Sequence, residues 1–193
     1  MTRIAIFASG DGSNAENIIR YFQNGGHDCE VALVVCNRPD AKVVQRSRRL
    51  QVPAVVLSRS EINDQATLSE LLDRYSVDGI VLAGFLLMLP GFVTERYRDR
   101  IVNIHPSLLP KYGGKGMYGR HVHEAVVNAG ESVTGITIHL VDEKYDSGRV
   151  LFQASTDVAP TDTPADVEGK VRILELQHYP RVIAETFVGR SPQ

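Results

Sequence analysis

The stretch Arg3-Ile-Ala-Ile-Phe-Ala-Ser-Gly-Asp-Gly-Ser-Asn14 contains a short apolar run that leads directly into a glycine-rich turn. The apolar run does not alternate with polar residues, as expected of a strand that is covered on both faces. The two glycines indicate a tight turn, and a helix is predicted to begin near Ser13 or Asn14 and to stop before Gly25. A strand, a tight turn and a helix in this order predict a βα unit.

The same pattern continues along the chain, because apolar runs alternate with longer segments of helical period. The predicted strands are Arg3–Ala8, Glu30–Cys36, Ala54–Leu57, Gly79–Ala83, Ile101–His105, Thr134–Val141 and Val150–Val158. Helices are predicted after Pro39, over Glu61–Tyr75, and from Thr163-Pro164 to about Val188. The last two strands are consecutive and are expected to pair antiparallel. We therefore predict an α/β fold with a Rossmann-like, mostly parallel sheet flanked by helices and an antiparallel strand pair in the C-terminal half.

Composition narrows the class of protein. The chain has 193 residues with 43% hydrophobic content, which fits one globular domain. A net charge of -2 gives no broad basic field, so nucleic acid is not an expected partner. No apolar stretch approaches the roughly 20 residues of a membrane span, and no signal peptide is evident. Cys29 and Cys36 bracket a predicted strand at a separation of about 20 Å, too far for a disulfide. The cytoplasm is the expected location.

The segment Asn103-Ile-His-Pro-Ser-Leu-Leu-Pro110 follows an apolar run and sets a carboxamide and an imidazole two residues apart. In an extended strand these side chains face the same way. Pro106 keeps His105 out of the α region, which favours a strand end. Both groups could then donate to one oxygen that gains negative charge, so the pair is predicted to stabilise an oxyanion. An ordinary strand end with a structural histidine is the simpler alternative.

The turn Ser9-Gly-Asp-Gly-Ser-Asn14 could bind a phosphate through backbone N–H groups at a helix N-terminus. It also fits the G-x-G-x-x-A fingerprint of dinucleotide-binding proteins. That fingerprint requires an acidic residue after the second strand, where this chain has Cys36-Asn-Arg38. NAD is therefore disfavoured, and NADP stays open through Arg38. A tight turn that binds nothing is a third alternative.

Asp146 lies in the loop Tyr145-Asp-Ser-Gly148 between the last two predicted strands. By its position alone it is a turn aspartate. It becomes a catalytic candidate if the fold places it beside His105, where its charge would raise the pKa of the imidazole.

The remaining histidines give no support for a metal. His121 and His123 are two residues apart on a predicted helix and point to different sides. Neither H-E-x-x-H nor C-x-x-C occurs, so no metal site is predicted. His139 and His178 are interpreted as structural residues.

Four blocks of sequence together resemble the folate-dependent phosphoribosylglycinamide formyltransferases, in the family's order and over almost the whole chain. The blocks are Ser9–Asn14, Leu82–Phe85, Asn103–Tyr112 and Asp146–Gly148, and Glu175 with His178-Tyr-Pro180 matches the family's last block. The resemblance implies direct transfer of a formyl group from 10-formyltetrahydrofolate, the co-substrate, to the amine of 5-phosphoribosylglycinamide in de novo purine (IMP) biosynthesis. It implies no covalent enzyme intermediate.

The resemblance assigns residues to three roles. The catalytic residues are Asn103 and His105, which would stabilise the oxyanion, and Asp146, which would orient and charge His105 and help a water to carry the proton. The substrate-binding residues are Gly12, Ser13 and Asn14 for the phosphate, Arg172 as a second cationic contact and Glu175 for the ribose. The folate-binding residues are Leu86, Leu87, Met88 and Leu89, the loop from Val141 to Asp146, and Asn103.

The family also implies one domain over residues 1–193, with a phosphate-binding half over about 1–100 and a catalytic and folate-binding half over about 101–193. One departure from the family is the segment Gly113-Gly-Lys-Gly-Met-Tyr-Gly119, which is longer and richer in glycine. Its backbone freedom suits a mobile flap over the active site.

Several alternatives stay open. Formyltetrahydrofolate deformylase and methionyl-tRNA formyltransferase share the Asn, His and Asp constellation, but the extra domain of each is not expected in this chain. A deformylase-like hydrolase is one alternative, and an NADP-binding or nucleotide-binding module is another. A homodimer is compatible with the sequence.

Overall fold

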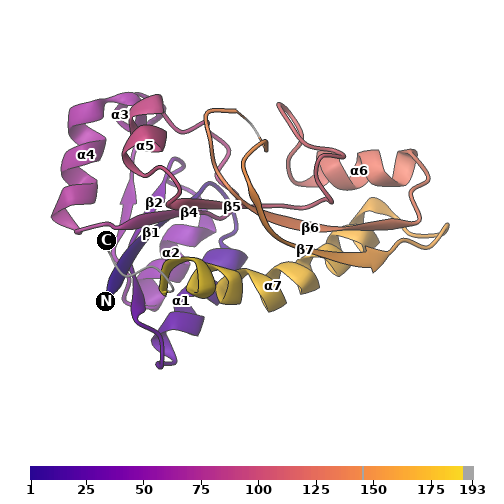
Figure 1. Ribbon diagram of the computed structural model, residues 1–193, viewed down its shortest axis with the longest axis horizontal. Helices are drawn as coiled ribbons and strands as arrows, with labels where there is room; N and C mark the ends of the chain where they lie inside the picture. Colours follow the sequence, from indigo (N-terminus) through magenta and orange to yellow (C-terminus); the bar gives the residue numbers. More distant parts are fainter. Residues whose placement is uncertain (145, 189–193) are drawn as a thin grey trace.

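The computed structural model describes residues 1–144 and 146–188. Tyr145, in the predicted loop around Asp146, and residues 189–193, at the end of the predicted second half, lie outside the described residues. The described chain forms a seven-stranded sheet between layers of helices (Figure 1). The strands are β1 (Thr2–Ala8), β2 (Cys29–Cys36), β3 (Ala54–Val56), β4 (Gly79–Leu82), β5 (Ile101–His105), β6 (Val133–Leu140) and β7 (Val150–Asp157).

The strand order across the sheet is β3-β2-β1-β4-β5-β6-β7. The first five strands of the chain pair parallel, β6 is antiparallel to β5, and β7 is antiparallel to β6. The predicted fold class is thereby confirmed: an α/β fold with a mostly parallel sheet and an antiparallel pair in the C-terminal half. Cys29 and Cys36 are free thiols at opposite ends of β2.

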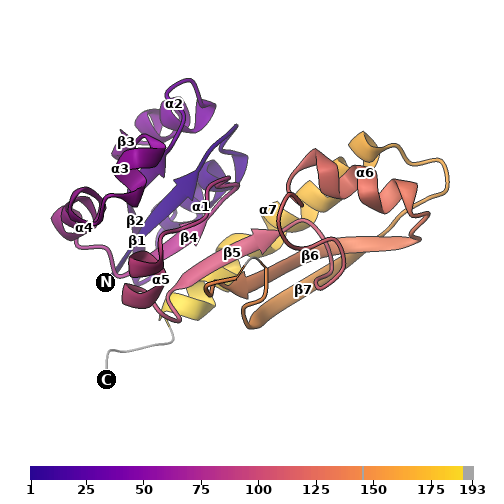
Figure 2. The same cartoon turned by 90° about the horizontal axis from the view of Figure 1, so that it is seen from above.

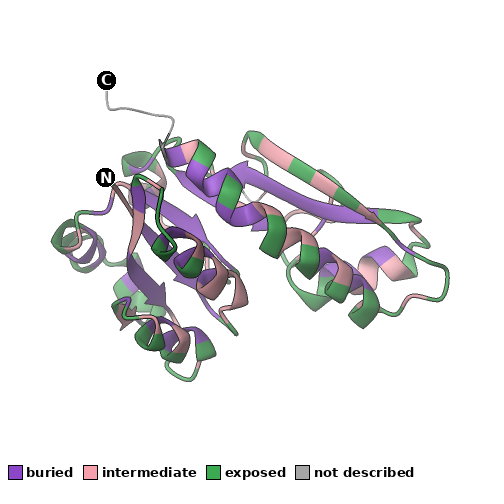
Figure 3. Ribbon diagram, turned by 90° about the horizontal axis from the view of Figure 1, so that it is seen from below, coloured by how far each residue is buried: buried purple, intermediate pink, exposed green. Residues whose placement is uncertain are grey.

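Helices cover both faces of the sheet. They are α1 (Ser13–Gln23), α2 (Lys42–Arg49), α3 (Arg59–Asn63), α4 (Gln65–Arg74), α5 (Gly91–Arg96), α6 (Arg120–Asn128) and α7 (Pro164–Val188). On one face, α1, α2 and α7 bury residues such as Ile18 and Ile183 against the sheet. On the other, α3, α4 and α5 pack residues such as Leu72 around Phe7. The central strands are accordingly buried on both sides, which accounts for their non-alternating sequences (Figure 3).

The predicted single helix over Glu61–Tyr75 is wrong, because the segment forms two helices, α3 and α4. Asp64 breaks the run with an extended backbone at ψ 113° and accepts the N–H of Thr67 at 2.8 Å, so its side chain caps α4. Ser58 and Glu61 form a capping box at the start of α3. The short helix α5 was not predicted.

The carboxyl ends of β1 and β4 lie side by side, although the segments that follow them depart in different directions along the strand order. In open α/β sheets such a switch point leaves a crevice in which ligands bind. The glycine-rich turn follows β1, and the segment Ala83–Leu89 follows β4. β5 is the next strand in the sheet and ends with Asn103 and His105. The fold therefore brings the predicted site segments together at the carboxyl ends of the central strands.

Tyr179 of α7 contacts the carboxyl ends of β4 and β5. Its ring is fully buried, and its hydroxyl lies 2.8 Å from the carbonyl oxygen of Leu82 and 3.1 Å from that of Val102. Burial raises the pKa of the phenol well above its usual value, so the hydroxyl stays a hydrogen-bond donor. The ends of β4 and β5 thus share one donor on α7.

Candidate active site

A cavity of about 530 Å³ opens at the carboxyl ends of β1, β4 and β5. Its size is ordinary for a small-molecule site. The residues that the sequence analysis assigns to catalysis, substrate or folate by name line it: Gly12, Ser13, Asn14, Leu86, Leu87, Met88, Leu89, Asn103, His105, Asp146, Arg172 and Glu175. Of the predicted folate loop, Val141, Asp142 and Lys144 line it as well. The fold brings these residues together from segments that are far apart in the chain.

The turn after β1 lines the cavity with Ser9 to Asn14. Gly12 has φ 80° and lies against Val43, so a Cβ atom at this position would come within 2.6 Å of that side chain. Only glycine fits there. Gly12 is also the N-cap of α1 and supplies no side-chain cap, which leaves the first N–H groups of the helix without a side-chain acceptor. A helix N-terminus of this kind favours an anion.

An ion-pair network holds the turn from behind. The Arg46 guanidinium donates to the Asp11 carbonyl at 2.8 Å, to the Asp11 carboxylate at 2.9 Å and to Glu16 at 2.6 Å. Hydrogen bonds from Arg46 and Arg20 lower the pKa of Glu16 to about 2. The Asp11 carboxylate is therefore paired with Arg46 of α2, and its negative charge beside the glycine-rich turn is partly neutralised.

Asn14 and Glu175 join the turn to α7. The Asn14 amide Nδ2 donates to Glu175 at 2.8 Å, and the Asn14 Oδ1 atom is buried without a partner among the described residues. Burial raises the pKa of Glu175, and Asn14 and the charge of Arg172 only partly oppose it. Glu175 is half-buried, and a carboxylate with spare lone pairs is an acceptor for hydroxyl groups of a ligand.

Asn103 is oriented by His139. Antiparallel pairing sets Asn103 of β5 opposite His139 of β6, and 3.0 Å separates Asn103 Nδ2 from His139 Nε2. The Nδ1–H of His139 is donated to the carbonyl of Leu140 at 2.8 Å, so in the neutral ring Nε2 is the acceptor. One N–H of the Asn103 carboxamide is thereby used, and the other has no partner within residues 1–144 and 146–188.

His105 is 3% exposed and lies between a carbonyl and a carboxylate. Its Nε2–H is donated to the Tyr112 carbonyl at 2.7 Å, and its Nδ1 lies 3.5 Å from Asp146 Oδ2. Burial lowers the pKa of His105 by more than Asp146 and Tyr112 raise it. Desolvation thus opposes the charged form of His105, Asp146 favours it, and the role of Asp146 in charging the ring stays a prediction.

Asp146 is held in place by three neighbours. It has φ 52°, accepts the Gly114 N–H at 2.9 Å, and places Oδ1 at 3.6 Å from His139 Nε2. Burial raises the pKa of this carboxyl, but the contacts with His139, Gly114 and His105 lower it by more. Asp146 is thus an anion that faces both imidazoles.

The folate-binding segment predicted after β4 has two faces. Leu86 and Met88 are 47% and 49% exposed in the cavity, whereas Leu87 and Leu89 pack into the core beside α5. All four residues line the cavity and only Leu87 and Leu89 also pack into the core, so the core role is confirmed for two of them and the ligand role of the run stays a prediction. The Ser9 hydroxyl fixes the segment, because it accepts the Leu86 N–H at 2.9 Å and donates to Asn37 at 2.6 Å.

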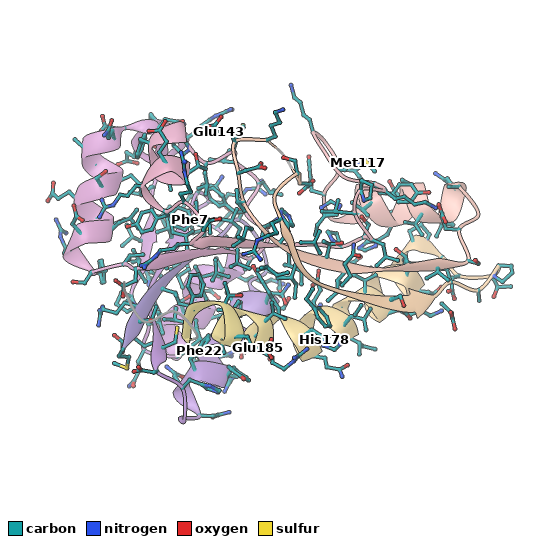
Figure 4. The ribbon with its side chains drawn as sticks, in the orientation of Figure 1. Phe7, Phe22, Met117, Glu143, His178 and Glu185 are labelled. Carbon is teal, nitrogen blue, oxygen red and sulfur yellow. The ribbon has the colours of Figure 1, made fainter. Side chains whose placement is uncertain are left out.

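The glycine-rich segment Gly113–Gly119 forms one wall of the cavity. Met117 from this segment and Glu143 from the β6–β7 loop lie on the same side of the sheet (Figure 4). Gly113 packs against Leu109, and Gly114 binds Asp146. A role as a mobile flap stays a prediction, which fails if amide hydrogen exchange without ligand is as slow here as in the core strands.

His139 and His123 are among the residues of the cavity wall that were not assigned to the site from the sequence. His123 is 3% exposed on α6, its Nδ1 has no partner in the described chain, and burial lowers its pKa. His121 is exposed and does not line the cavity, as its spacing of two residues from His123 on a helix predicts. The pairing of β5 with β6 is the signal that would have found His139, since it sets that residue opposite Asn103.

The described residues form neither a metal site nor a membrane-spanning helix. Within residues 1–144 and 146–188, no cluster of three or more His, Cys, Asp or Glu side chains is arranged to hold a metal ion. None of the described helices is long and apolar enough to cross a membrane.

The formyl transferase family matches residues 2–183, and the chain belongs to that family. Its relatives include the phosphoribosylglycinamide formyltransferase of Haemophilus influenzae, with 36% identity over 98% of this chain and 89% of the relative. The chloroplastic enzyme of the same name from Arabidopsis thaliana is 38% identical over 94% of this chain, which spans only 64% of that relative. The crystal structure of phosphoribosylglycinamide formyltransferase from Bacillus halodurans superposes with a TM-score of 0.86 at 36% identity, covering 95% of this chain and 94% of that one.

Proposed function

We propose that this chain transfers the formyl group of 10-formyltetrahydrofolate to the amine of 5-phosphoribosylglycinamide in purine biosynthesis. One observation carries the proposal: a single cavity joins an anion-binding turn to an Asn103, His105 and Asp146 cluster and to an exposed apolar strip. The relatives bear the name of this activity. The two halves of the chain, about 1–100 and 101–193, would supply the phosphate site and the catalytic and folate site respectively.

The substrate would lie with its phosphate on the turn at Gly12, Ser13 and Asn14. Backbone N–H groups and the α1 terminus favour an anion there, and the exposed Arg172 adds a positive charge across the cavity. Glu175 would accept the ribose hydroxyls, since it is half-buried beside Asn14 and retains acceptor capacity. The amine would then point toward β5.

In the reaction, the amine nitrogen attacks the formyl carbon and forms the new C–N bond while the carbonyl oxygen gains negative charge. The free N–H of Asn103 and a protonated His105 would donate to that oxygen. The bond from the formyl carbon to the folate nitrogen then breaks. The amine loses one proton and the folate nitrogen gains one, and Asp146 would hold the water that carries it.

The pteridine would rest on Leu86 to Leu89, with Leu86 and Met88 as its apolar contacts and the nearby backbone as its polar ones. Asp146 and the loop that begins at Val141 would close the other side. The reaction as written passes through no metal ion. The cytoplasm is the proposed location, because a reducing compartment suits the free thiols Cys29 and Cys36.

The test measures the absorbance of the folate product with and without phosphoribosylglycinamide, for the native chain, His105→Ala and His121→Ala. The proposal expects an amine-dependent signal that His105→Ala loses and that His121→Ala keeps, since His121 is exposed outside the cavity. A signal without the amine would instead indicate a deformylase-like hydrolase. No folate turnover, together with quenching of NADPH fluorescence, would favour the nucleotide-binding alternative.

A further inference from the structure

The two ring nitrogens of His105 face different acceptors, and only one of the contacts has the length of an ordinary hydrogen bond. Nε2 lies 2.7 Å from the carbonyl oxygen of Tyr112, whereas Nδ1 lies 3.5 Å from Asp146 Oδ2. A carbonyl can only accept, so the proton of this short contact is on Nε2. The Tyr112 carbonyl therefore decides which nitrogen of the imidazole is turned toward Asp146.

Tyr112 presents this carbonyl from an unusual backbone conformation. Its φ is 56°, in the left-handed region that bulky side chains rarely occupy. Conformations of this kind persist only where surrounding contacts hold them, and they gather at functional sites. The Ser107 hydroxyl holds the preceding peptide, because it donates to the Lys111 carbonyl at 2.6 Å. The side chain of Tyr112 needs a contact of its own.

Glu131, in the short turn between α6 and β6, supplies that contact (Figure 2). Its carboxylate accepts the Tyr112 hydroxyl at 2.9 Å and the Lys111 ammonium at 2.9 and 3.1 Å. Hydrogen bonds from Lys111 and Tyr112 lower the pKa of Glu131, so the carboxyl stays ionised. Glu131 does not line the cavity, so any effect of this residue on a bound substrate is indirect.

The groups that act directly on His105 come from four segments. Burial lowers the pKa of His105 and the charge of His139 on β6 adds to this effect, whereas Asp146 and the Tyr112 carbonyl raise it. His123 on α6 is the further titratable neighbour of His105. An imidazole between a carbonyl and a carboxylate can donate to both only when it is charged. Of these contacts, the one with Tyr112 is the contact that Glu131 anchors.

We propose that Glu131 is a positioning residue, which holds Tyr112 so that its carbonyl keeps the Nε2–H of His105 and turns Nδ1 toward Asp146 and the reacting atoms. This role rests on the proposed function, in which a protonated His105 donates to the formyl oxygen. The Nδ1–H of the charged ring would then be the donor. Loss of the anchor would release the Tyr112 carbonyl and lower the share of charged His105 at neutral pH.

The first test follows the ring of His105 by NMR in the unliganded chain with isotope-labelled histidine, and His105→Gln identifies its signals by their absence. In the native chain the neutral ring should carry its proton on Nε2. In Glu131→Ala and Tyr112→Phe this proton should exchange with water about tenfold faster or more, since the contact opens more often. The ring should also titrate at lower pH. Glu124→Gln, which removes an ion pair with Arg120 on α6, is the matched control and should change neither property.

Formyl-transfer kinetics form the second test. Glu131→Ala and Tyr112→Phe should each lower kcat about tenfold, a part of the roughly 10² to 10⁴ that a positioned acid contributes, with little change in KM. The pH profile of kcat should shift toward acid. Both variants break one contact, so the double variant should be no worse than the more severe single one. Glu131→Gln keeps an acceptor for the Tyr112 hydroxyl and should keep most of kcat.

Several outcomes would overturn the role of Glu131. They are native-like His105 signals in Glu131→Ala and Tyr112→Phe, losses of kcat that add up in the double variant, and a loss of kcat without a shift of the pH profile. If Glu131→Ala does not fold, Tyr112→Phe and Glu131→Gln provide the same comparison. A native chain without formyl transfer would instead overturn the proposed function, and the NMR comparison would still decide whether Glu131 positions His105.

Discussion

His139 accepts a hydrogen bond from Asn103, with 3.0 Å between the imidazole Nε2 and the carboxamide Nδ2. The two residues face each other because β5 and β6 run antiparallel, and His139 can accept because its other nitrogen donates to Leu140. The carboxamide is thereby held in one orientation before any ligand binds. Preorganised donors stabilise a developing charge without reorganising during the reaction.

Asn103→Ala removes the donor that this contact holds in place. We expect kcat to fall by about 10² to 10³, the loss typical of one oxyanion donor, with a smaller change in KM for either substrate. Steady-state kinetics with both substrates varied would measure it. Asn128→Ala, at the exposed end of α6, is the matched control and should leave kcat unchanged. A loss confined to KM would show that Asn103 binds without stabilising the transition state.

Asp146→Asn tests the coupling between the carboxylate and His105. Burial already lowers the pKa of His105, and Asp146 opposes that effect, so removing its charge should lower the pKa further. Activity that depends on protonated His105 is lost as pH rises through this pKa. The pH profile of kcat should therefore shift toward acid, and kcat itself should fall by about 10² or more. A profile that keeps its position would exclude the coupling.

Glu175→Gln should weaken substrate binding and stabilise the fold. Burial raises the pKa of Glu175, so the folded state holds this proton more readily than the unfolded state and stability falls as pH rises through that range. The amide carries no charge, so its variant should melt higher at neutral pH, by about 2–4 °C per kcal/mol recovered.

The same Glu175→Gln variant should raise KM for phosphoribosylglycinamide and leave KM for the folate alone. Calorimetric melting and steady-state kinetics would record the two effects. Glu185→Gln, on the exposed side of the same helix, should change neither. Equal increases in both KM values would contradict a ribose-binding role for Glu175.

Glu16→Gln should destabilise the chain only where the carboxylate is ionised. Hydrogen bonds from Arg46 and Arg20 lower its pKa from 4.5 to about 2, so its contribution is complete above pH 4.5 and is lost as pH falls toward 2. We expect a loss of about 1–2 kcal/mol in the free energy of unfolding at neutral pH, after solvent screening.

Urea unfolding of the Glu16→Gln and native chains at several pH values would follow this loss. Glu70→Gln removes an exposed pair with Arg74 and should change stability little at any pH. A difference between native and Glu16→Gln that persists unchanged down to pH 2 would assign the loss to packing instead of charge.

The sequence was sufficient for those parts of the molecule that depend on local patterns. The apolar run before Gly12 predicted a buried strand and a tight turn, and the structure has both. The local pattern did not predict the break at Asp64. The extended backbone of Asp64 ends α3, and its side chain caps α4. Leu87 packs into the core, whereas Met88 is exposed in the cavity. This difference depends on packing against α5, which cannot be predicted from the apolar run alone.

The sequence predicted which residues gather at the cavity but not the contacts that they make there. The resemblance named Asn103, His105 and Asp146, and all three line one cavity. Their electrostatics required the structure, because the pKa of His105 depends on how far burial outweighs a carboxylate 3.5 Å away. His139 was interpreted as a structural residue, because its contact with Asn103 comes from strand pairing across 36 positions of sequence.

The hydroxyl of Tyr179 has a practical consequence for redesign of the chain. It reaches the carbonyls directly before Ala83 and Asn103, from a position one helical turn beyond Glu175. A single buried oxygen therefore links α7 to the two strand ends that lead into the Ala83–Leu89 segment and Asn103. Changes at Leu86 or Met88 leave this link in place. Changes at Tyr179 are expected to disturb the proposed contacts of both substrates at once.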